Sequence, residues 1–184
     1  MPSIVWTTGV EAAGVEADVA FGGAFYACVD AAQLALPVEP ANIGRFIDLG
    51  REIKAAVEAA DEVAHPEEPE LRGIYGVVFY ERLGPGRQRN VTVFADGEVD
   101  RSPCGSGTSA RLALLDAAGE LERGATLHHS SVIGTEFEGR VVAETRVADR
   151  PAVVTEIAGS AHLTGFHQFV LEGEDPLGDG FLIR

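Results

Sequence analysis

The order in which strand-like and helical segments follow one another is the feature that most limits the fold of this chain. The strand-like segments, rich in β-branched and aromatic residues, are 15–21, 25–29, 73–81, 90–95, 131–139, 140–147, 152–159 and 161–171. Helical spacing of apolar residues is found in 42–64 and 112–121. Because these helices do not alternate regularly with strands, a doubly wound parallel sheet is disfavoured. We predict an α+β fold with mostly antiparallel strand pairing, built as a single unit over 1–184.

The longer helical pattern spans 42–64. Phe46 and Val57 are among the apolar residues that fall on one face at helical spacing. Asn42 is a preferred N-cap residue, and the polar stretch HPEEPE at 65–70 ends the pattern. We expect an amphipathic helix that begins at Asn42.

A pair of glycines separates the first two strand-like segments. Gly22 and Gly23 interrupt an alternating apolar pattern that resumes at Phe25. Glycine inside a strand pattern marks a tight turn, a bulge or the close approach of another group. The pattern alone leaves these three alternatives open.

Charge and cysteine content exclude several classes of protein. The net charge is −15, from 29 acidic against 14 basic residues, which disfavours nucleic acid and anionic membranes as partners. No apolar run is long enough for a membrane span, and the first residues lack the pattern of a secretory signal. Two cysteines, Cys28 and Cys104, do not make a disulfide framework. These features predict a protein of the reducing cytoplasm.

The stretch DRSPCGSGTSARLALL at 100–115 is the strongest candidate for a functional site. It predicts a helix start, with Ser102 as N-cap and Pro103 in the first helical position. The backbone N–H groups near Cys104, Gly105 and Ser106 would then lack intrahelical partners and could bind a carboxylate or phosphate. The same positive field would favour the thiolate of Cys104.

Several alternative functions of this stretch fit its residues less well. GSGTSA at 105–110 fits a relaxed dinucleotide pattern but does not directly follow a strand, and a phosphate loop would need a lysine. Arg111 is one place beyond the position that a cysteine phosphatase loop requires. Acyl transfer would need a histidine base beside Cys104, which sequence cannot place. A buried structural thiol remains open as well.

Asp100 suggests how an amino acid could be held. Its carboxylate could bind a cationic amine while the helix start binds a carboxylate, so that Cys104 would face the α-carbon. A thiolate there could remove the α-proton. Racemisation by this route needs a second acid on the opposite face of the substrate.

The motif DRSPCGSGTSAR closely resembles the second cysteine motif of the proline racemase family. DVAFGGAFYA at 18–27, SVIGTEFEG at 131–139 and the segment 156–177 resemble the family too. The family comprises proline racemases, 4-hydroxyproline epimerases and trans-3-hydroxyproline dehydratases. The resemblance implies a fold like that of diaminopimelate epimerase, with a mostly antiparallel sheet wrapped around a central helix that starts at the cysteine motif. It also implies homodimers that need no metal or cofactor.

The same resemblance implies roles for individual residues. Cys104 would be a catalytic thiol and Asp100 the acid that contacts the substrate nitrogen. Gly105 and Ser106 would supply backbone donors to the substrate carboxylate. Phe94 would be the aromatic residue that closes the pocket over the substrate ring.

One motif of the family is missing from this chain. Members carry an earlier Met-Cys-Gly-His segment with a first catalytic cysteine, and Cys28 in FYACVD lacks that context and is expected to pack in the core. The chain therefore resembles the second half of a two-lobe enzyme, and we expect no racemisation from it alone. A dehydratase that needs one thiol and a non-catalytic binding protein are the alternatives. The histidines, including the pair His128 and His129, are expected to be structural or exposed rather than metal ligands.

Overall fold

The computed structural model describes residues 1–181. Its elements are β1 (Ser3–Ala12), β2 (Val15–Phe21), β3 (Phe25–Asp30), α1 (Ile43–Ala60), β4 (Ile74–Gly84), β5 (Arg87–Phe94), β6 (Glu98–Val99), α2 (Gly105–Ala117), β7 (Leu127–Ser131), β8 (Glu136–Val147) and β9 (Arg150–Ala158). Short 3-10 turns at Ala31–Leu34 and Pro40–Asn42 lead from β3 into α1. Among these helices, none has the length and apolarity needed to cross a lipid bilayer.

The strands close into a ring. In the described residues the sheet has the order β4-β3-β2-β1-β9-β8-β7-β5-β6, and a further pairing of β4 with β5 joins its two sides. Pairing is parallel between β3 and β4 and between β5 and β7, and antiparallel in the other strand pairs. The predicted α+β fold with mostly antiparallel pairing is therefore confirmed.

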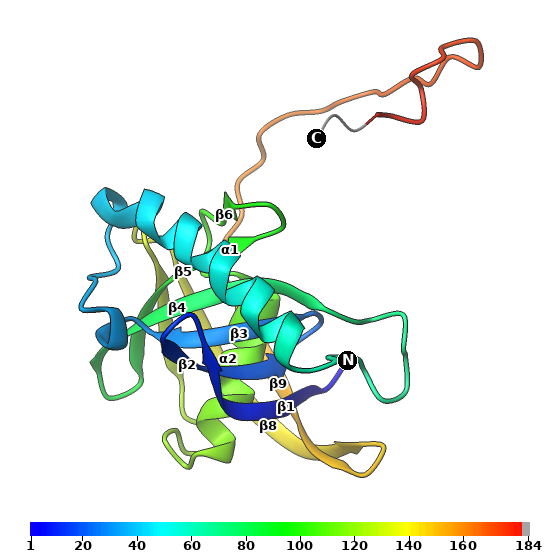
Figure 1. Cartoon of the computed structure of the whole chain (residues 1–184). Coiled ribbons are helices and arrows are strands. Elements are labelled where there is room, and N and C mark those ends of the chain that lie inside the picture. Colours follow the sequence, from blue (N-terminus) through cyan, green and yellow to red (C-terminus); the bar gives the residue numbers. More distant parts are fainter. Residues whose placement is uncertain (182–184) are drawn as a thin grey trace.

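The helix that follows the cysteine motif lies inside this ring (Figure 1). Every residue of α2 from Gly107 to Leu115 is buried, so the helix has no solvent face over that length. One side of α2 packs against apolar residues of β2, β3 and β4, and the other side packs against β7, β8 and β9. A sheet wrapped around a central helix, as expected from the resemblance, is the observed arrangement.

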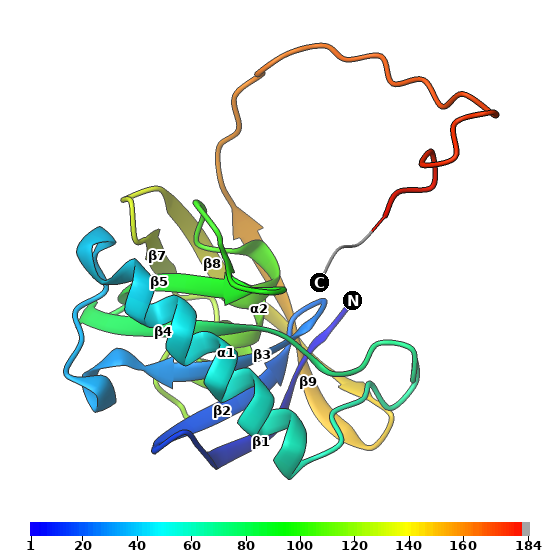
Figure 2. The same cartoon turned by 45° about the horizontal axis from the view of Figure 1, so that its top comes forward.

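Helix α1 packs on the outside of the ring, across β1, β3, β4 and β5 (Figure 2). Its buried residues Phe46, Gly50, Ile53 and Val57 lie one or two turns apart, which confirms the predicted apolar face. The helix is shorter than the predicted range 42–64. Asn42 occupies the N-cap position, but its side chain donates to the Pro37 carbonyl at 2.9 Å instead of capping the helix.

Several strand boundaries differ from those predicted. The stretch 131–139 is not one strand: β7 ends at Ser131, a turn follows, and β8 runs without a break to Val147. The prediction also missed β1, which lies between β2 and β9. Strand β1 has bulges opposite β2, and these register shifts explain why its sequence lacks a regular two-residue alternation.

The predicted strand at 161–171 is wrong. Residues 159–181 form no helix or strand and extend away from the ring (Figures 1 and 2). Large apolar side chains are exposed along this segment: Leu163, Phe166, Phe169, Val170, Leu171, Leu177 and Phe181. The β-branched and aromatic residues that suggested a strand have no neighbouring strand to pair with among the described residues. We call 159–181 the apolar tail.

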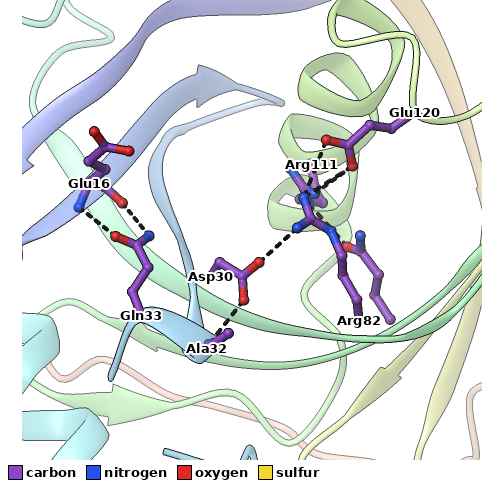
Figure 3. A network of polar contacts seen from close by, with 8 residues as sticks. Glu16, Asp30, Ala32, Gln33, Arg82, Arg111 and Glu120 are labelled. Carbon is purple, nitrogen blue, oxygen red and sulfur yellow. Dashed lines mark hydrogen bonds and ion pairs between the residues drawn. The ribbon is translucent and has the colours of Figure 1, made fainter. Parts of the chain in front are cut away.

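A polar network ties the carboxyl end of α2 to the sheet (Figure 3). Arg82 on β4 pairs with Asp30 at 2.9 Å and with Glu120 at 3.1 Å. Arg111 is buried, stacks over the Tyr80 ring at 3.8 Å, and lies 3.9 Å from Glu120. Arg111 is thus engaged in fixing α2 to the sheet rather than closing a phosphate loop.

Candidate active site

Helix α2 begins two residues later than the sequence predicts. Its first residue is Gly105, and Cys104 is the N-cap with φ of 64° and ψ of 111°. Ser102 and Pro103 are therefore not the N-cap and first helical residue. Ser102 instead forms a local turn, in which its Oγ accepts the Cys104 N–H at 3.0 Å. This short turn competes with the helix for the chain, as serine side chains often do.

The helix start presents backbone donors to an open face. The first hydrogen bond of the α2 ladder runs from Thr108 N–H to the Cys104 carbonyl at 2.8 Å, so the amides of Gly105 and Ser106 precede it. Gly105 is exposed, and no atom lies within 4 Å of the place where its Cβ would stand. A carboxylate could approach these amides, where the positive end of the helix dipole adds to the attraction.

The thiol of Cys104 is buried beside two hydroxyl groups. Its Sγ lies 3.4 Å from the Tyr26 hydroxyl and 3.9 Å from Ser106 Oγ, and the two hydroxyls are 2.7 Å apart. Tyr26 comes from β3 and is 1% exposed, whereas Cys104 is 7% exposed. Only a small part of the cysteine thus faces the side from which a ligand would arrive.

Burial raises the pKa of the Cys104 thiol above its ordinary value, and the nearby Asp100 charge acts in the same direction. Hydrogen bonds from Tyr26, the Gly107 amide and Ser106 oppose this increase in pKa. The helix start does favour the thiolate through the Gly107 amide, as expected, but burial raises the pKa of Cys104 by more than the local donors lower it. The pKa of Tyr26 is raised as well, chiefly by burial, so its hydroxyl keeps its proton.

The structure brings Asp100 close to the thiol but leaves Phe94 farther away. Asp100 Oδ1 accepts the Ser102 N–H at 2.8 Å, which ties this carboxylate to the same turn that holds Cys104. Phe94, at the end of β5, stacks on Tyr75 with ring centroids 5.7 Å apart. Tyr75 in turn meets Tyr26 edge to face at 5.8 Å. Phe94 thus reaches the thiol site through two intervening aromatic rings.

The glycine pair is explained by close approach. A Cβ on Gly22 would stand 2.2 Å from the Ser106 carbonyl oxygen and 2.4 Å from the Ala110 nitrogen. Gly23 has φ of +117°, which favours glycine. The turn between β2 and β3 therefore lies directly against the first turns of α2 and fixes the helix start relative to Tyr26.

Sequence reasoning missed Tyr26 and a buried polar group beneath the motif. Tyr26 is separated from Cys104 by 78 residues, so no local spacing could relate them. Asn90, Thr108 and His129 come from three different elements and are fully buried. In the sequence, each of these three residues is only a polar residue within an apolar stretch, and this pattern does not reveal which residues it contacts. Cys28, by contrast, is buried in the core as predicted.

One of the histidines, His128, lies among carboxylates. The ligand atoms of His128, Glu136 and Glu138 lie within 4.8 Å of one another on β7 and β8. Arg87 already approaches Glu136 at 3.6 Å, and all three groups are partly or fully exposed. The prediction that the histidines bind no metal stays a prediction.

Comparison with known proteins gives a consistent result. A family model described as proline racemase matches residues 6–182. The chain is 46% identical over 191 aligned positions to a trans-3-hydroxy-L-proline dehydratase of Burkholderia ambifaria and equally to a 3-hydroxyproline 2-epimerase of Burkholderia multivorans. It is 41% identical to a proline racemase of Clostridioides difficile. All of this chain is covered in each case, but only 57% of each relative.

Solved structures agree with the sequence matches. A hydroxyproline epimerase from Agrobacterium vitis, with bound trans-4-hydroxy-L-proline, superposes with a TM-score of 0.90 at 38% identity. A probable proline racemase from Agrobacterium radiobacter, with bound carbonate, gives 0.91 at 36% identity. Each covers the whole of this chain, which spans 54% and 55% of the two structures.

Proposed function

Because this chain belongs to the proline racemase family, we propose that it supplies one catalytic thiol of an enzyme that racemises or epimerises proline or a hydroxyproline. The observation that carries the proposal is the position of Cys104. Its thiol lies at the amino end of a buried helix, beside Tyr26 and next to the exposed amide of Gly105. This arrangement can accept a proton from carbon while a neighbouring carboxylate is held by backbone donors.

The geometry supports a defined division of roles. The amides of Gly105 and Ser106 would bind the substrate carboxylate, and Asp100 would bind its ammonium group. The role of Phe94, which would close the apolar side of the substrate ring, rests on the family resemblance, because Tyr75 and Tyr26 lie between Phe94 and the thiol. The Cys104 thiolate would then take the α-proton: the Cα–H bond breaks, an S–H bond forms, and the electron pair delocalises into the carboxylate at the positive end of α2. None of these steps requires a metal or cofactor.

A second acid must return the proton on the opposite face, and we propose that it comes from a first lobe outside this chain. The chain, as one unit over 1–184, spans 57% of the relatives' length, which leaves room for such a lobe. The apolar tail supports this assignment, because side chains such as Phe166 and Phe169, each 91% exposed, need an apolar partner. We propose association with that lobe rather than a homodimer of this chain alone.

Two other activities have specific support. The name of the Burkholderia ambifaria relative favours a trans-3-hydroxy-L-proline dehydratase, for which one thiol would suffice. The burial of Cys104, which is 7% exposed, favours a protein that binds proline analogues without turnover. We retain the racemase or epimerase as the leading proposal because the matching family model is described as proline racemase, and an epimerase and a proline racemase are both among the relatives. Both cysteines are free thiols, which supports the cytoplasm as the compartment.

The test combines this chain with the amino-terminal lobe of the Burkholderia multivorans relative. Exchange of the α-proton is followed by NMR in D₂O with L-proline, trans-4-hydroxy-L-proline and trans-3-hydroxy-L-proline. We expect no turnover by either part alone, turnover by the mixture, and none when the chain carries Cys104→Ser. Chiral chromatography then separates an epimer from an unsaturated dehydration product.

Each outcome decides between the proposals. An epimer formed only with intact Cys104 supports the racemase or epimerase, and a dehydration product replaces it with the dehydratase. Tight binding of pyrrole-2-carboxylate without turnover in the mixture identifies a binding protein. Rapid racemisation by the chain alone would overturn the assignment of a missing lobe.

A further inference from the structure

The carbonyl oxygen of Pro103, immediately before the thiol residue, is held by two buried side chains. Asn90 Nδ2 donates to it at 2.7 Å, and Thr108 Oγ1 donates at 3.1 Å. At the other end of the same peptide unit, the Cys104 N–H donates to Ser102 Oγ at 3.0 Å. The orientation of the peptide plane between Pro103 and Cys104 is thus fixed at both of its polar ends.

This orientation matters because Cys104 is strained. Its φ of 64° lies in the left-handed region, which a side chain with Cβ adopts at a cost in free energy. Such a conformation persists where the surroundings fix it by several contacts, and it is common at functional sites. The hydrogen bonds on the Pro103 carbonyl provide this fixation directly next to the strained residue.

His129 completes the arrangement from β7. Its Nδ1 lies 2.9 Å from Thr108 Oγ1. The single Thr108 hydroxyl proton goes to the Pro103 carbonyl, which can only accept, so Nδ1–H of His129 must be the donor to Thr108. Burial lowers the pKa of His129 to about 3, so the ring is neutral at pH 7 and carries its proton on Nδ1.

The burial of these groups argues against simple packing. Asn90, Thr108 and His129 are each 0% exposed. Asn90 Oδ1 and His129 Nε2 have no hydrogen-bond partner within the described residues, which makes the group costly to keep in a core. Apolar residues would fill the same space at a lower cost, unless the donors to Pro103 serve a purpose.

We propose that Asn90, Thr108 and His129, together called the Pro103 clamp, are positioning residues for the Cys104 thiol. The clamp holds Sγ against the Tyr26 hydroxyl and the Gly107 amide, the contacts that favour the thiolate. Its catalytic importance rests on the proposed function, but its effect on the thiol does not.

The test measures whether the thiol stays coupled to Tyr26 when the clamp is broken. The folded chain is alkylated with iodoacetamide at a series of pH values and then digested. Mass spectrometry of the peptide that contains Cys104 gives the alkylation rate of this thiol alone, without a contribution from Cys28. Tyr26→Phe removes a donor to the thiolate and is expected to raise the pH at which the Cys104 alkylation rate is half-maximal, the midpoint, by about one pH unit. In Thr108→Val, we expect the same Tyr26→Phe change to raise the midpoint by less than half as much.

Matched variants separate positioning from loss of packing. Thr108→Ser keeps the hydroxyl and is expected to retain the full Tyr26→Phe shift. Thr155→Val removes another hydroxyl that bonds to α2, through Ser109 Oγ at 3.1 Å, and is also expected to retain it. Asn90→Leu removes the second donor to Pro103 and repeats the test if Thr108→Val does not fold.

The clamp is refuted if Tyr26→Phe shifts the alkylation midpoint by the full amount in both Thr108→Val and Asn90→Leu. It is also refuted if Tyr26→Phe as a single substitution does not shift this midpoint. These measurements need no turnover. Suppose that the Tyr26→Phe shift is present in the chain with an intact clamp and is lost in the clamp variants, but that the chain stays inactive when combined with its complementing lobe. This result would overturn the proposed function and support the clamp.

Discussion

At the scale of single residues, burial favours the neutral form of the Cys104 thiol, while three hydrogen-bond donors beside it favour the thiolate. Tyr26, Ser106 and the Gly107 amide already lower the pKa of the thiol relative to burial alone. A substrate ammonium group beside Asp100 would neutralise the carboxylate charge that now raises this pKa. The ammonium group of a bound amino acid would therefore remove one of the two causes that raise the pKa of this thiol.

His129 leads to a prediction about acid stability. Its pKa is lowered to about 3 in the folded chain, chiefly by burial, against about 6.5 when unfolded. Between pH 6.5 and pH 3, His129 is therefore protonated in the unfolded state but not in the folded state, and the free energy of unfolding decreases as the pH is lowered. This single group should lower the free energy of unfolding by about 2 kcal/mol between pH 7 and pH 5. Urea unfolding at the two pH values measures the difference.

Replacement of the ring isolates this contribution. His129→Asn keeps an N–H donor near the Nδ1 position and does not titrate, so its loss of stability between pH 7 and pH 5 should be about 2 kcal/mol smaller. The control is His162→Asn in the apolar tail, where the side chain is exposed and the pH dependence should be unchanged. Equal pH dependence in His129→Asn and the unaltered chain would contradict the prediction.

At the scale of elements, the contact between the β2–β3 turn and α2 leaves no room for a methyl group. Gly22→Ala would place Cβ against the backbone of Ser106 and Ala110, neither of which can move without displacing the helix start. We expect the free energy of unfolding to decrease by about 3 kcal/mol or more. Urea unfolding measured by circular dichroism gives the value.

A glycine in the other helix provides the comparison. Gly44 lies in the first turn of α1, is exposed, and has no atom within 4 Å of the position of a Cβ. Gly44→Ala should leave stability unchanged or raise it by up to about 1 kcal/mol. If Gly22→Ala were as well tolerated as Gly44→Ala, the close packing at the helix start would be disproved.

The same elements show what sequence can and cannot predict. Helix α1 was predictable because its apolar face is repeated over several turns. The start of α2 was placed two residues early, because a positive φ at Cys104 leaves no mark in a pattern built on preferences for Ser102 and Pro103. Tyr26 could not be assigned to the site, since strand register over a long chain separation decides where its hydroxyl lies.

At the scale of the whole molecule, the exposed apolar tail should make this chain associate with itself in solution. Phe166→Ser combined with Phe169→Ser removes two of the most exposed apolar side chains. We expect a smaller sedimentation coefficient at matched concentration, because less apolar surface is offered to other copies. The free energy of unfolding should change by less than about 0.5 kcal/mol, since these side chains are not packed on the ring.

Polar positions of the tail serve as the control. Thr164→Ser combined with Gln168→Ser alters the same segment without removing apolar surface, so sedimentation should stay as in the unaltered chain. A loss of about 2 kcal/mol or more in the aromatic double variant would instead mean that the tail packs against the ring in solution.

The closure of the ring has a consequence for how this protein is made. Strand β1 pairs with β9 through Ser3 opposite Val153. The sheet can therefore close around α2 only after β9, the last strand, has been synthesised. At ribosomal speed, the interval from the first strand to the last is on the order of 10 s. During that time the apolar surface of α2 lacks part of its cover. Nascent chains of this fold should therefore be clients of chaperones at the ribosome, and an interruption of synthesis shortly before β9 should yield aggregation rather than a folded fragment.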